Sequence, residues 1–175
     1  MNAKINIKDS ILETNRLVLR PFKRSDLDDF YAYAKVWGVG QMAGWLPHQS
    51  IKQSQEILEK FIEGEKTFAI VYKNNHKVIG SIGIENLRNI DEEKLKKLKG
   101  RELGVVLSKE YWGLGIMPEA VKKVIDYLFH DCNLDFITCS YFIDNNQSER
   151  VQEKCGFKFL KKVILPTQMQ EEKEG

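Results

Sequence analysis

The sequence predicts one domain of the mixed α/β class, in which helices flank a twisted, mainly antiparallel sheet with one parallel strand–helix–strand unit. Two observations carry this prediction. The chain has 175 residues, enough to build one hydrophobic core. Its apolar residues recur with strand or helix periodicity, in the order strand, two helices, three strands, helix, strand, helix, strand. We expect residues 11–165 to form the structured core and residues 166–175 a polar tail.

The first third of the chain is predicted to form one strand and two helices. Arg16–Arg20 alternates polar and apolar side chains, as a half-buried strand does. Ser25 is a predicted N-cap for a helix that continues to Ala34. Ser50 stands three residues before a glutamine, which is capping-box spacing, and it should begin a second helix that ends near Gly64.

The middle of the chain contains a predicted hairpin followed by a central strand. Thr67–Tyr72 and Lys77–Ile84 are strand-like and flank the turn-forming Asn74-Asn75-His76. The charged segment Asp91–Lys99 is expected to be a solvated loop or a short helix. The apolar run Leu103–Leu107 is predicted to be a buried strand.

The last third contains the predicted parallel unit. Apolar residues at helical spacing after Pro118 predict a helix, and the apolar run Phe136–Phe142 predicts the next strand. Together with the preceding strand at Leu103–Leu107 they should form a right-handed crossover. A short helix over Gln147–Lys154 and a last strand over Phe157–Leu165 complete the prediction.

Composition excludes several classes of function. The formal net charge of +2 is too small to indicate DNA binding. No apolar run approaches the ~20 residues needed to cross a bilayer, and the N-terminus lacks a signal-peptide core. We therefore expect a cytoplasmic protein without a membrane partner. Cys132, Cys139 and Cys155 lack C-x-x-C spacing, so neither a disulfide framework nor a metal site is predicted.

The segment Tyr111–Ala120 is the most informative part of the chain. Its glycines, Gly113 and Gly115, lie between a predicted strand and a predicted helix. The first amides of a helix have no partner within the helix and carry partial positive charge, which suits an anion. Glycine lets a phosphate approach the main chain closely. The segment predicts a site for a phosphorylated cofactor, the alternative being a plain strand-to-helix turn.

Four motifs occur in a fixed order along the chain. They are T-x-R-L-x-L-R at Thr14–Arg20, E-x-G-[apolar]-x-L at Glu102–Leu107, W-G-x-G with a following E-A at Trp112–Ala120, and N-x-x-S … E-K-x-G-F at Asn145–Phe157. A chain with these motifs resembles the GNAT N-acetyltransferase superfamily, in particular its ribosomal-protein (RimJ/RimL-like) branch. The resemblance implies the GNAT fold, with the parallel unit around a site for acetyl-CoA.

The resemblance also implies which residues bind acetyl-CoA. Main-chain groups of the central strand would pair with the amides of the pantetheine arm, and Asn145 would bind the same arm. The loop before the next helix would hold the diphosphate. The implied cofactor residues are Val105, Val106, Leu107, Trp112, Gly113, Leu114, Gly115, Ile116, Met117 and Asn145.

Two residues are candidates for the chemistry. By the family pattern Glu102 would take a proton from the amine, directly or through water, and Ser148 would hydrogen-bond the thioester sulfur. A carboxylate suits an α-amine with a pKa near 8 better than a lysine near 10.4. The alternatives are a solvated charge for Glu102 and a helix cap at Asn145 or Asn146, with Ser148 part of the same capping turn.

The acceptor side is implied by one loop. Trp45 and His48 lie between the first two predicted helices, where the family places part of its acceptor groove, and His48 is an alternative base. A solvated loop histidine is the competing interpretation. The predicted function is transfer of acetyl from acetyl-CoA directly to a primary amine, above all a protein N-terminal α-amine. The alternatives are a small-amine or antibiotic acetyltransferase and a non-catalytic acyl-CoA-binding module.

Three features depart from the family pattern. Met117 replaces a small residue and is expected to crowd the cofactor or shift the loop. Gln152 stands where many members carry a tyrosine that protonates the leaving thiolate. The polar tail after Leu165 is not expected to pair as a strand. That would leave a sheet edge open or covered by a second subunit, which makes a homodimer a candidate.

Overall fold

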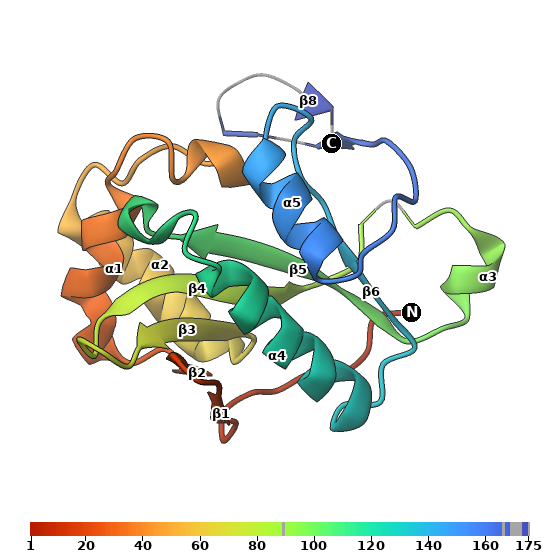
Figure 1. The fold of residues 1–175 in the computed structure, drawn as a ribbon, viewed down its shortest axis with the longest axis horizontal. Coiled ribbons are helices and arrows are strands. Elements are labelled where there is room, and N and C mark those ends of the chain that lie inside the picture. Colours follow the sequence, from red (N-terminus) through yellow and green to blue (C-terminus); the bar gives the residue numbers. More distant parts are fainter. Residues whose placement is uncertain (89, 166, 169–172, 175) are drawn as a thin grey trace.

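The computed structural model describes residues 1–88, 90–165, 167–168 and 173–174. Its main sheet has six strands in the order β1-β2-β3-β4-β5-β6 (Figure 1). Neighbouring strands are antiparallel except β5 and β6, which are parallel and complete the predicted crossover. The strands are β1 (Leu12–Glu13), β2 (Leu17–Pro21), β3 (Thr67–Tyr72), β4 (Val78–Glu85), β5 (Gly100–Leu107) and β6 (Phe136–Cys139). The predicted α/β class and mainly antiparallel sheet are confirmed.

Helices cover both faces of this sheet. The helix α4 (Ile116–His130) crosses one face, while α1 (Leu27–Ala34) and α2 (Ile51–Gly64) pack on the other (Figure 1). The shorter α5 (Asn146–Lys154) lies beside the end of β5, and α3 (Glu93–Lys96) is the short helix expected in the charged segment.

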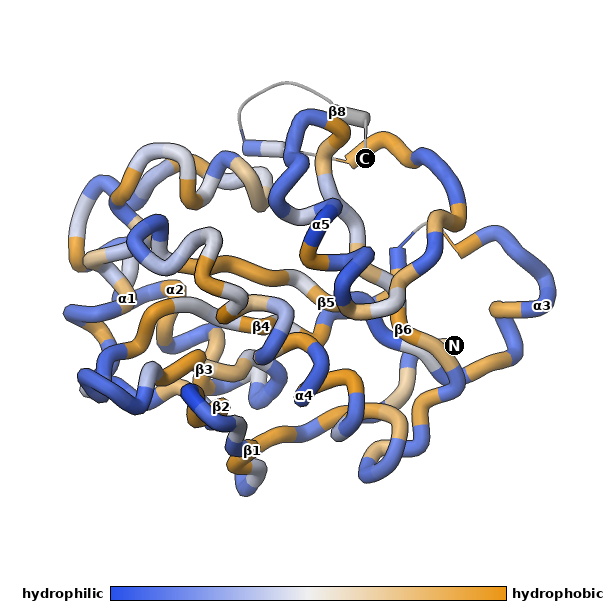
Figure 2. Tube along the Cα trace, viewed as in Figure 1, coloured by the Kyte–Doolittle hydropathy of each residue, from blue (hydrophilic) through white to orange (hydrophobic). Residues whose placement is uncertain are grey.

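Successive side chains of a strand point to opposite faces of the sheet, and each face packs against its own apolar cluster. Phe68 and Ile70 of β3 join the cluster under α4, whereas Ala69 and Val71 join the cluster under α1 and α2. In Figure 2 orange segments are accordingly frequent in the strands, and much of the outer loops is blue. The core also begins before the predicted boundary at residue 11, since Ala3, Ile5 and Ile7 are buried in the α4 cluster.

The parallel strands β5 and β6 separate part-way along their length. Their pairing begins at Gly100 with Phe136 and ends at Leu103 with Cys139. Beyond that point β5 continues to Leu107, paired only with β4, whereas the chain after Cys139 turns away. The predicted strand Phe136–Phe142 is therefore shorter than expected. The separation produces a fork that exposes one edge of β5.

The predicted helix starts are right in one case and wrong in another. The Ser50 hydroxyl accepts a hydrogen bond from the Gln53 amide at 3.2 Å, so the predicted cap of α2 is confirmed. Ser25 is not a cap, because it lies within a 3₁₀ turn that precedes α1. The carboxylate that organises this turn belongs to Asp26, whose Oδ2 accepts from the Lys23 amide at 2.7 Å.

The predicted last strand is wrong. Residues 157–163 form no strand, and only β7 (Ile164–Leu165) pairs, with β8 (Lys173–Glu174), in a separate two-stranded sheet. The physical reason is that Leu160 and Lys161 break the period-two alternation begun at Phe157–Phe159, so neither face of this stretch is continuously apolar as a half-buried strand needs. The expectation of an unpaired tail is also wrong at β8, while residues 166, 169–172 and 175 lie outside the described part.

Within the described ranges, no helix is long and apolar enough to cross a membrane.

Candidate active site

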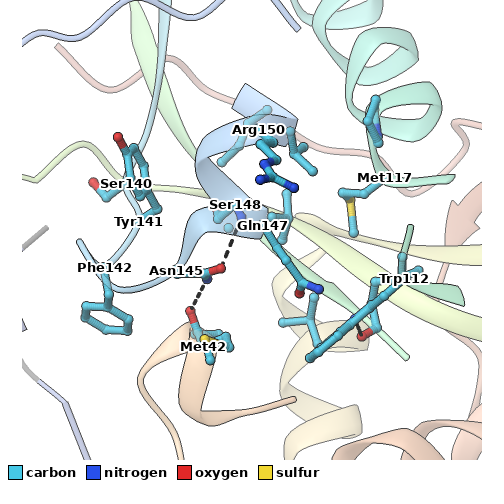
Figure 3. Close-up of a pocket in the computed structure, with 18 of the residues that line it drawn as sticks. Met42, Trp112, Met117, Ser140, Tyr141, Phe142, Asn145, Gln147, Ser148 and Arg150 are labelled. Carbon is cyan, nitrogen blue, oxygen red and sulfur yellow. Dashed lines mark hydrogen bonds between the residues drawn. The ribbon is translucent and has the colours of Figure 1, made fainter. Parts of the chain in front are cut away.

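A cavity of about 440 Å³ lies in the fork between β5 and the chain that follows β6. Its walls come from β5, from the loop that leads into α4 and from the start of α5 (Figure 3). The predicted site residues that line it are Glu102, Val105, Val106, Leu107, Trp112, Gly113, Gly115, Ile116, Met117, Asn145 and Ser148. The fold thus brings together three of the four sequence motifs, whereas Leu114, Trp45 and His48 do not line this cavity.

The head of α4 offers main-chain amides to the cavity. Gly113 and Gly115 adopt left-handed conformations, with φ of 76° and 73°, which glycine reaches without strain. Gly115 is the N-cap and has no side chain to cap the helix. Among the described residues, no side-chain hydrogen bond to the Ile116 or Met117 amide takes its place. These unpaired amides fit the diphosphate of a nucleotide cofactor.

Met117 is accommodated without filling the loop. Its side chain is buried, belongs to the core cluster under α4 and forms part of the cavity wall beside Trp112 (Figure 3). The loop keeps its two glycine turns, and crowding of the cofactor by Met117, which lines the cavity, stays a prediction.

The exposed edge of β5 forms the opposite wall. Val105, Val106 and Leu107 pair with β4 on one side, so alternate main-chain groups on the other side face the fork. One of these groups is already engaged, since the Trp112 indole donates to the Leu107 carbonyl at 2.9 Å. The remaining free edge suits a ligand that, like the pantetheine arm, carries amides along a chain.

Asn145 has the structural role that was left open as an alternative. Its Oδ1 accepts from the Ser148 amide at 3.0 Å and caps α5, and its Nδ2 donates to the Met42 carbonyl at 3.2 Å (Figure 3). The side chain is buried and ties α5 to the loop before α2. A role in cofactor binding would use the second N–H of the Asn145 amide or the remaining lone pair of its oxygen.

Glu102 is a buried, paired carboxylate and not a solvated one. It is 2% exposed and lies on β5 at the point where β6 begins to diverge. The Arg88 guanidinium donates to both of its oxygens, and the Ser140 hydroxyl donates to Oε1 at 3.2 Å. The hydrogen bond to Glu102 raises the pKa of Arg88, so the guanidinium stays charged beside this carboxylate.

The structure adds site residues that the motifs did not indicate. Gln147, Arg150 and Lys154 line the cavity from α5, and Gln147 and Arg150 extend toward the side that holds Trp112 (Figure 3). Their spacing of three and four residues is a sequence signal for one helix face. Arg88 lies in an irregular segment after β4, where no periodicity could have revealed it.

A second cavity reaches the same carboxylate from the other side of the fork. It has a volume of about 730 Å³ and lies between β6 and residues 157–163, which form no strand. Arg88, Glu102, Ser140 and Tyr141 line both cavities. A ligand in the first cavity and an acceptor in the second would therefore meet at Glu102.

The residues expected to line the acceptor groove lie in the core instead. His48 is buried, its Nδ1 is 2.7 Å from the Ser54 hydroxyl, and its ring meets Phe30 edge-on. Burial lowers the pKa of His48, which keeps the ring neutral. Trp45 packs against His48 and Gly40. Neither residue lines either cavity, and their packing stabilises the loop between α1 and α2.

Comparisons with known proteins agree with this geometry. The chain is 30% identical over 152 residues to a Bacillus licheniformis protein named uncharacterized N-acetyltransferase p20, a match that covers 83% of the chain and 81% of the relative.

Two solved structures are similar in fold. An acetyltransferase of the GNAT family from Bacillus anthracis has a TM-score of 0.79 at 20% identity, with 94% of each chain covered. The ribosomal-protein-S5-alanine acetyltransferase from Vibrio fischeri has a TM-score of 0.70 at 24% identity, over 95% of this chain and 94% of that one. The model of the acetyltransferase (GNAT) domain matches residues 16–158. The chain therefore belongs to the GNAT family of acetyltransferases and is an acetyltransferase.

Proposed function

We propose that this acetyltransferase binds acetyl-CoA in the fork cavity and transfers the acetyl group to a primary amine, above all a protein N-terminal α-amine. The observation that carries the proposal is the juxtaposition of two unpaired main-chain surfaces. One is the uncapped head of α4, and the other is the free edge of β5. Both line one cavity of about 440 Å³.

The chain's own residues would divide the work of binding. Amides from Gly113 to Met117 would hold the diphosphate, and the free edge of β5 would align the pantetheine amides. Arg150 and Lys154 add positive charge on the α5 wall. Bound acetyl-CoA supplies an acyl group activated as a thioester, and Ser148, which lines the same wall, would orient its sulfur end.

Glu102 would serve the acceptor amine. It lies where the two cavities meet, so an amine that enters through the second cavity approaches its carboxylate. Arg88 and Ser140 fix the carboxylate in place, and a bridging water would carry the amine proton to it. We infer direct transfer between the two ligands, because burial raises the pKa of the three thiols and leaves no activated cysteine.

The preference for an α-amine follows from acid–base chemistry. An α-amine with a pKa near 8 is about one-quarter neutral at pH 7.5, whereas a lysine near 10.4 is neutral in about one molecule in a thousand. A buried carboxylate already paired with an arginine is a weak base. It can complete deprotonation of the first kind of amine far more readily than of the second.

The test combines binding with an acceptor panel. Thermal-shift titration with acetyl-CoA should stabilise the chain, and thiol release should then depend on the acceptor. The panel holds a peptide with a free N-terminus, the same peptide N-terminally blocked but with a lysine, spermidine and an aminoglycoside. Faster thiol release with the free α-amine supports the proposal. Faster thiol release with spermidine or the aminoglycoside would mean that the acceptor is a small amine and not a protein N-terminus. Stabilisation without any acceptor-dependent release indicates a binding module, and no stabilisation contradicts the acetyl-CoA site.

A further inference from the structure

An ion pair joins the first sequence motif to the head of α4. Glu119 lies in the first turn of α4, and Arg16 lies in the turn before β2. The Arg16 Nε and Nη2 atoms both lie 2.7 Å from Glu119 Oε2, and the Arg16 amide donates to Oε1 at 3.0 Å. The Thr14 hydroxyl donates to the same Oε1 at 2.6 Å. The Glu119 carboxylate is thus held by one turn of the chain about a hundred residues away.

The same guanidinium also holds the glycine turn. Arg16 Nη1 donates to the Leu114 carbonyl at 2.8 Å, and a Cβ atom added to Gly115 would lie 3.6 Å from Arg16 Nη2. The Leu114 carbonyl is therefore directed toward Arg16, a residue that does not line the cavity. In a left-handed turn this orientation helps to present the following amides to the opposite side.

The charges explain why such a contact is needed at this place. A carboxylate in the first turn of a helix interacts well with the helix dipole, but here it stands close to the amides proposed to bind a diphosphate. Burial alone would raise the pKa of Glu119, but the hydrogen bonds from Thr14 and Arg16 lower it, so the group remains an anion. Without Arg16, that anion would repel the ligand.

We propose that Arg16 is a positioning residue for coenzyme A. Its guanidinium fixes the Leu114–Gly115 turn and cancels the charge of Glu119 beside the diphosphate. This inference rests on the proposed function. It assigns the first motif of the chain a role in cofactor affinity, although Arg16 does not line the cavity.

The experiment is a charge-cancellation series. Isothermal titration measures the Kd of coenzyme A for the wild type, Arg16→Ala, Glu119→Gln, the double variant and Arg16→Lys, in 50 mM and 500 mM NaCl. Arg16 is 40% exposed, so solvent screens part of its charge. We expect Arg16→Ala to raise Kd about tenfold in low salt and less in high salt. The double variant should recover most of that loss, because the uncompensated carboxylate is gone.

The outcomes separate a positioning role from a purely structural one. Arg16→Lys keeps the positive charge but loses the planar guanidinium with its several N–H donors, so it should restore only part of the affinity for coenzyme A. At saturating acetyl-CoA, kcat of Arg16→Ala should stay within about twofold of the wild type, because the substitution is expected to raise the KM for acetyl-CoA and not to change the chemical step. A double variant as weak as Arg16→Ala, with no salt dependence, overturns the proposal. A wild type that does not bind coenzyme A overturns the proposed function and this inference together.

Discussion

At the scale of single residues, the site depends on one buried carboxylate and its partners. The sequence pattern placed Glu102 at the start of the central strand, and the structure places it where the two cavities meet. Its partners Arg88 and Ser140 were not predictable, because both lie in irregular segments. The burial of His48 was not predictable either, because nothing in the sequence indicates that the ring of a loop histidine lies within hydrogen-bond distance of the Ser54 hydroxyl.

Replacing Glu102 by glutamine should lower turnover and leave cofactor affinity nearly unchanged. We expect kcat/KM for the amine to fall by about 10²–10⁴-fold, the usual contribution of a proton acceptor. The loss should be larger at pH 6.5 than at pH 8.5, because more of the amine is protonated at low pH. Steady-state rates over that pH range, with the Kd of coenzyme A, provide the measurement. Glu110→Gln is the matched control, since Glu110 is exposed near the same strand. An equal loss of coenzyme A affinity would assign Glu102 a structural role instead.

The half-buried cysteine of β6 should be inert in the folded protein. Burial raises the pKa of Cys139 to about 12, so its thiolate population at pH 8 is about a thousandfold below that of a thiol with a pKa near 9. Alkylation of the native protein at pH 8 should therefore leave Cys139 unmodified and the transferase active, as peptide mass mapping and residual rates would show. Rapid alkylation of Cys139 with loss of activity would indicate an accessible thiolate and reopen a covalent route.

At the scale of elements, the predictions succeeded where local physics decides the structure. The β3–β4 hairpin, the capped start of α2 and the amphipathic α4 follow from turn residues, a cap and periodicity, and all three are present. The predictions failed where several local solutions compete. Ser25 does not cap α1, because it lies inside a 3₁₀ turn whose Asp26 carboxylate accepts from the Lys23 amide and also pairs with Arg20 at 2.8 Å. The lysine-rich stretch 157–163 cannot present one apolar face, so it forms no strand.

The glycine turn before α4 should be needed for the cofactor more than for the fold. Gly115→Val forces a branched side chain into a left-handed conformation and narrows the approach to the helix amides. Gly156→Val is the matched control, because Gly156 has a φ of 86°, free space for a Cβ atom and no place in either cavity. Both variants should lose similar thermal stability. Only Gly115→Val should weaken coenzyme A by more than about tenfold, equivalent to about 1.4 kcal/mol. Equal affinity of the two variants for coenzyme A would contradict a diphosphate site at this turn.

The cap of α2 gives a prediction about stability alone. Ser50→Ala removes the acceptor for the Gln53 amide and should cost about 1 kcal/mol of unfolding free energy. Denaturant unfolding should report this loss, while the Kd of coenzyme A should remain that of the wild type, because α2 lies on the other face of the sheet from α4. A large loss of affinity would indicate that the two faces are coupled.

At the scale of the whole molecule, the sheet brings distant parts of the sequence to one place. Its two faces pack against separate apolar clusters, and the early end of the β5–β6 pairing opens the fork. The order of motifs predicted that the segments around Glu102, Gly115 and Asn145 share a site. It could not predict the second cavity, because that space exists only through the irregular path of residues 157–163.

The central claim is that unpaired amides at the head of α4 bind the diphosphate of coenzyme A. A crystal structure of the chain with bound coenzyme A tests it most directly. We expect diphosphate oxygens about 2.7–3.2 Å from amide nitrogens of residues 113–117, with the pantetheine arm along the free edge of β5. A coenzyme bound outside the fork, or a diphosphate that touches none of these amides, would contradict it.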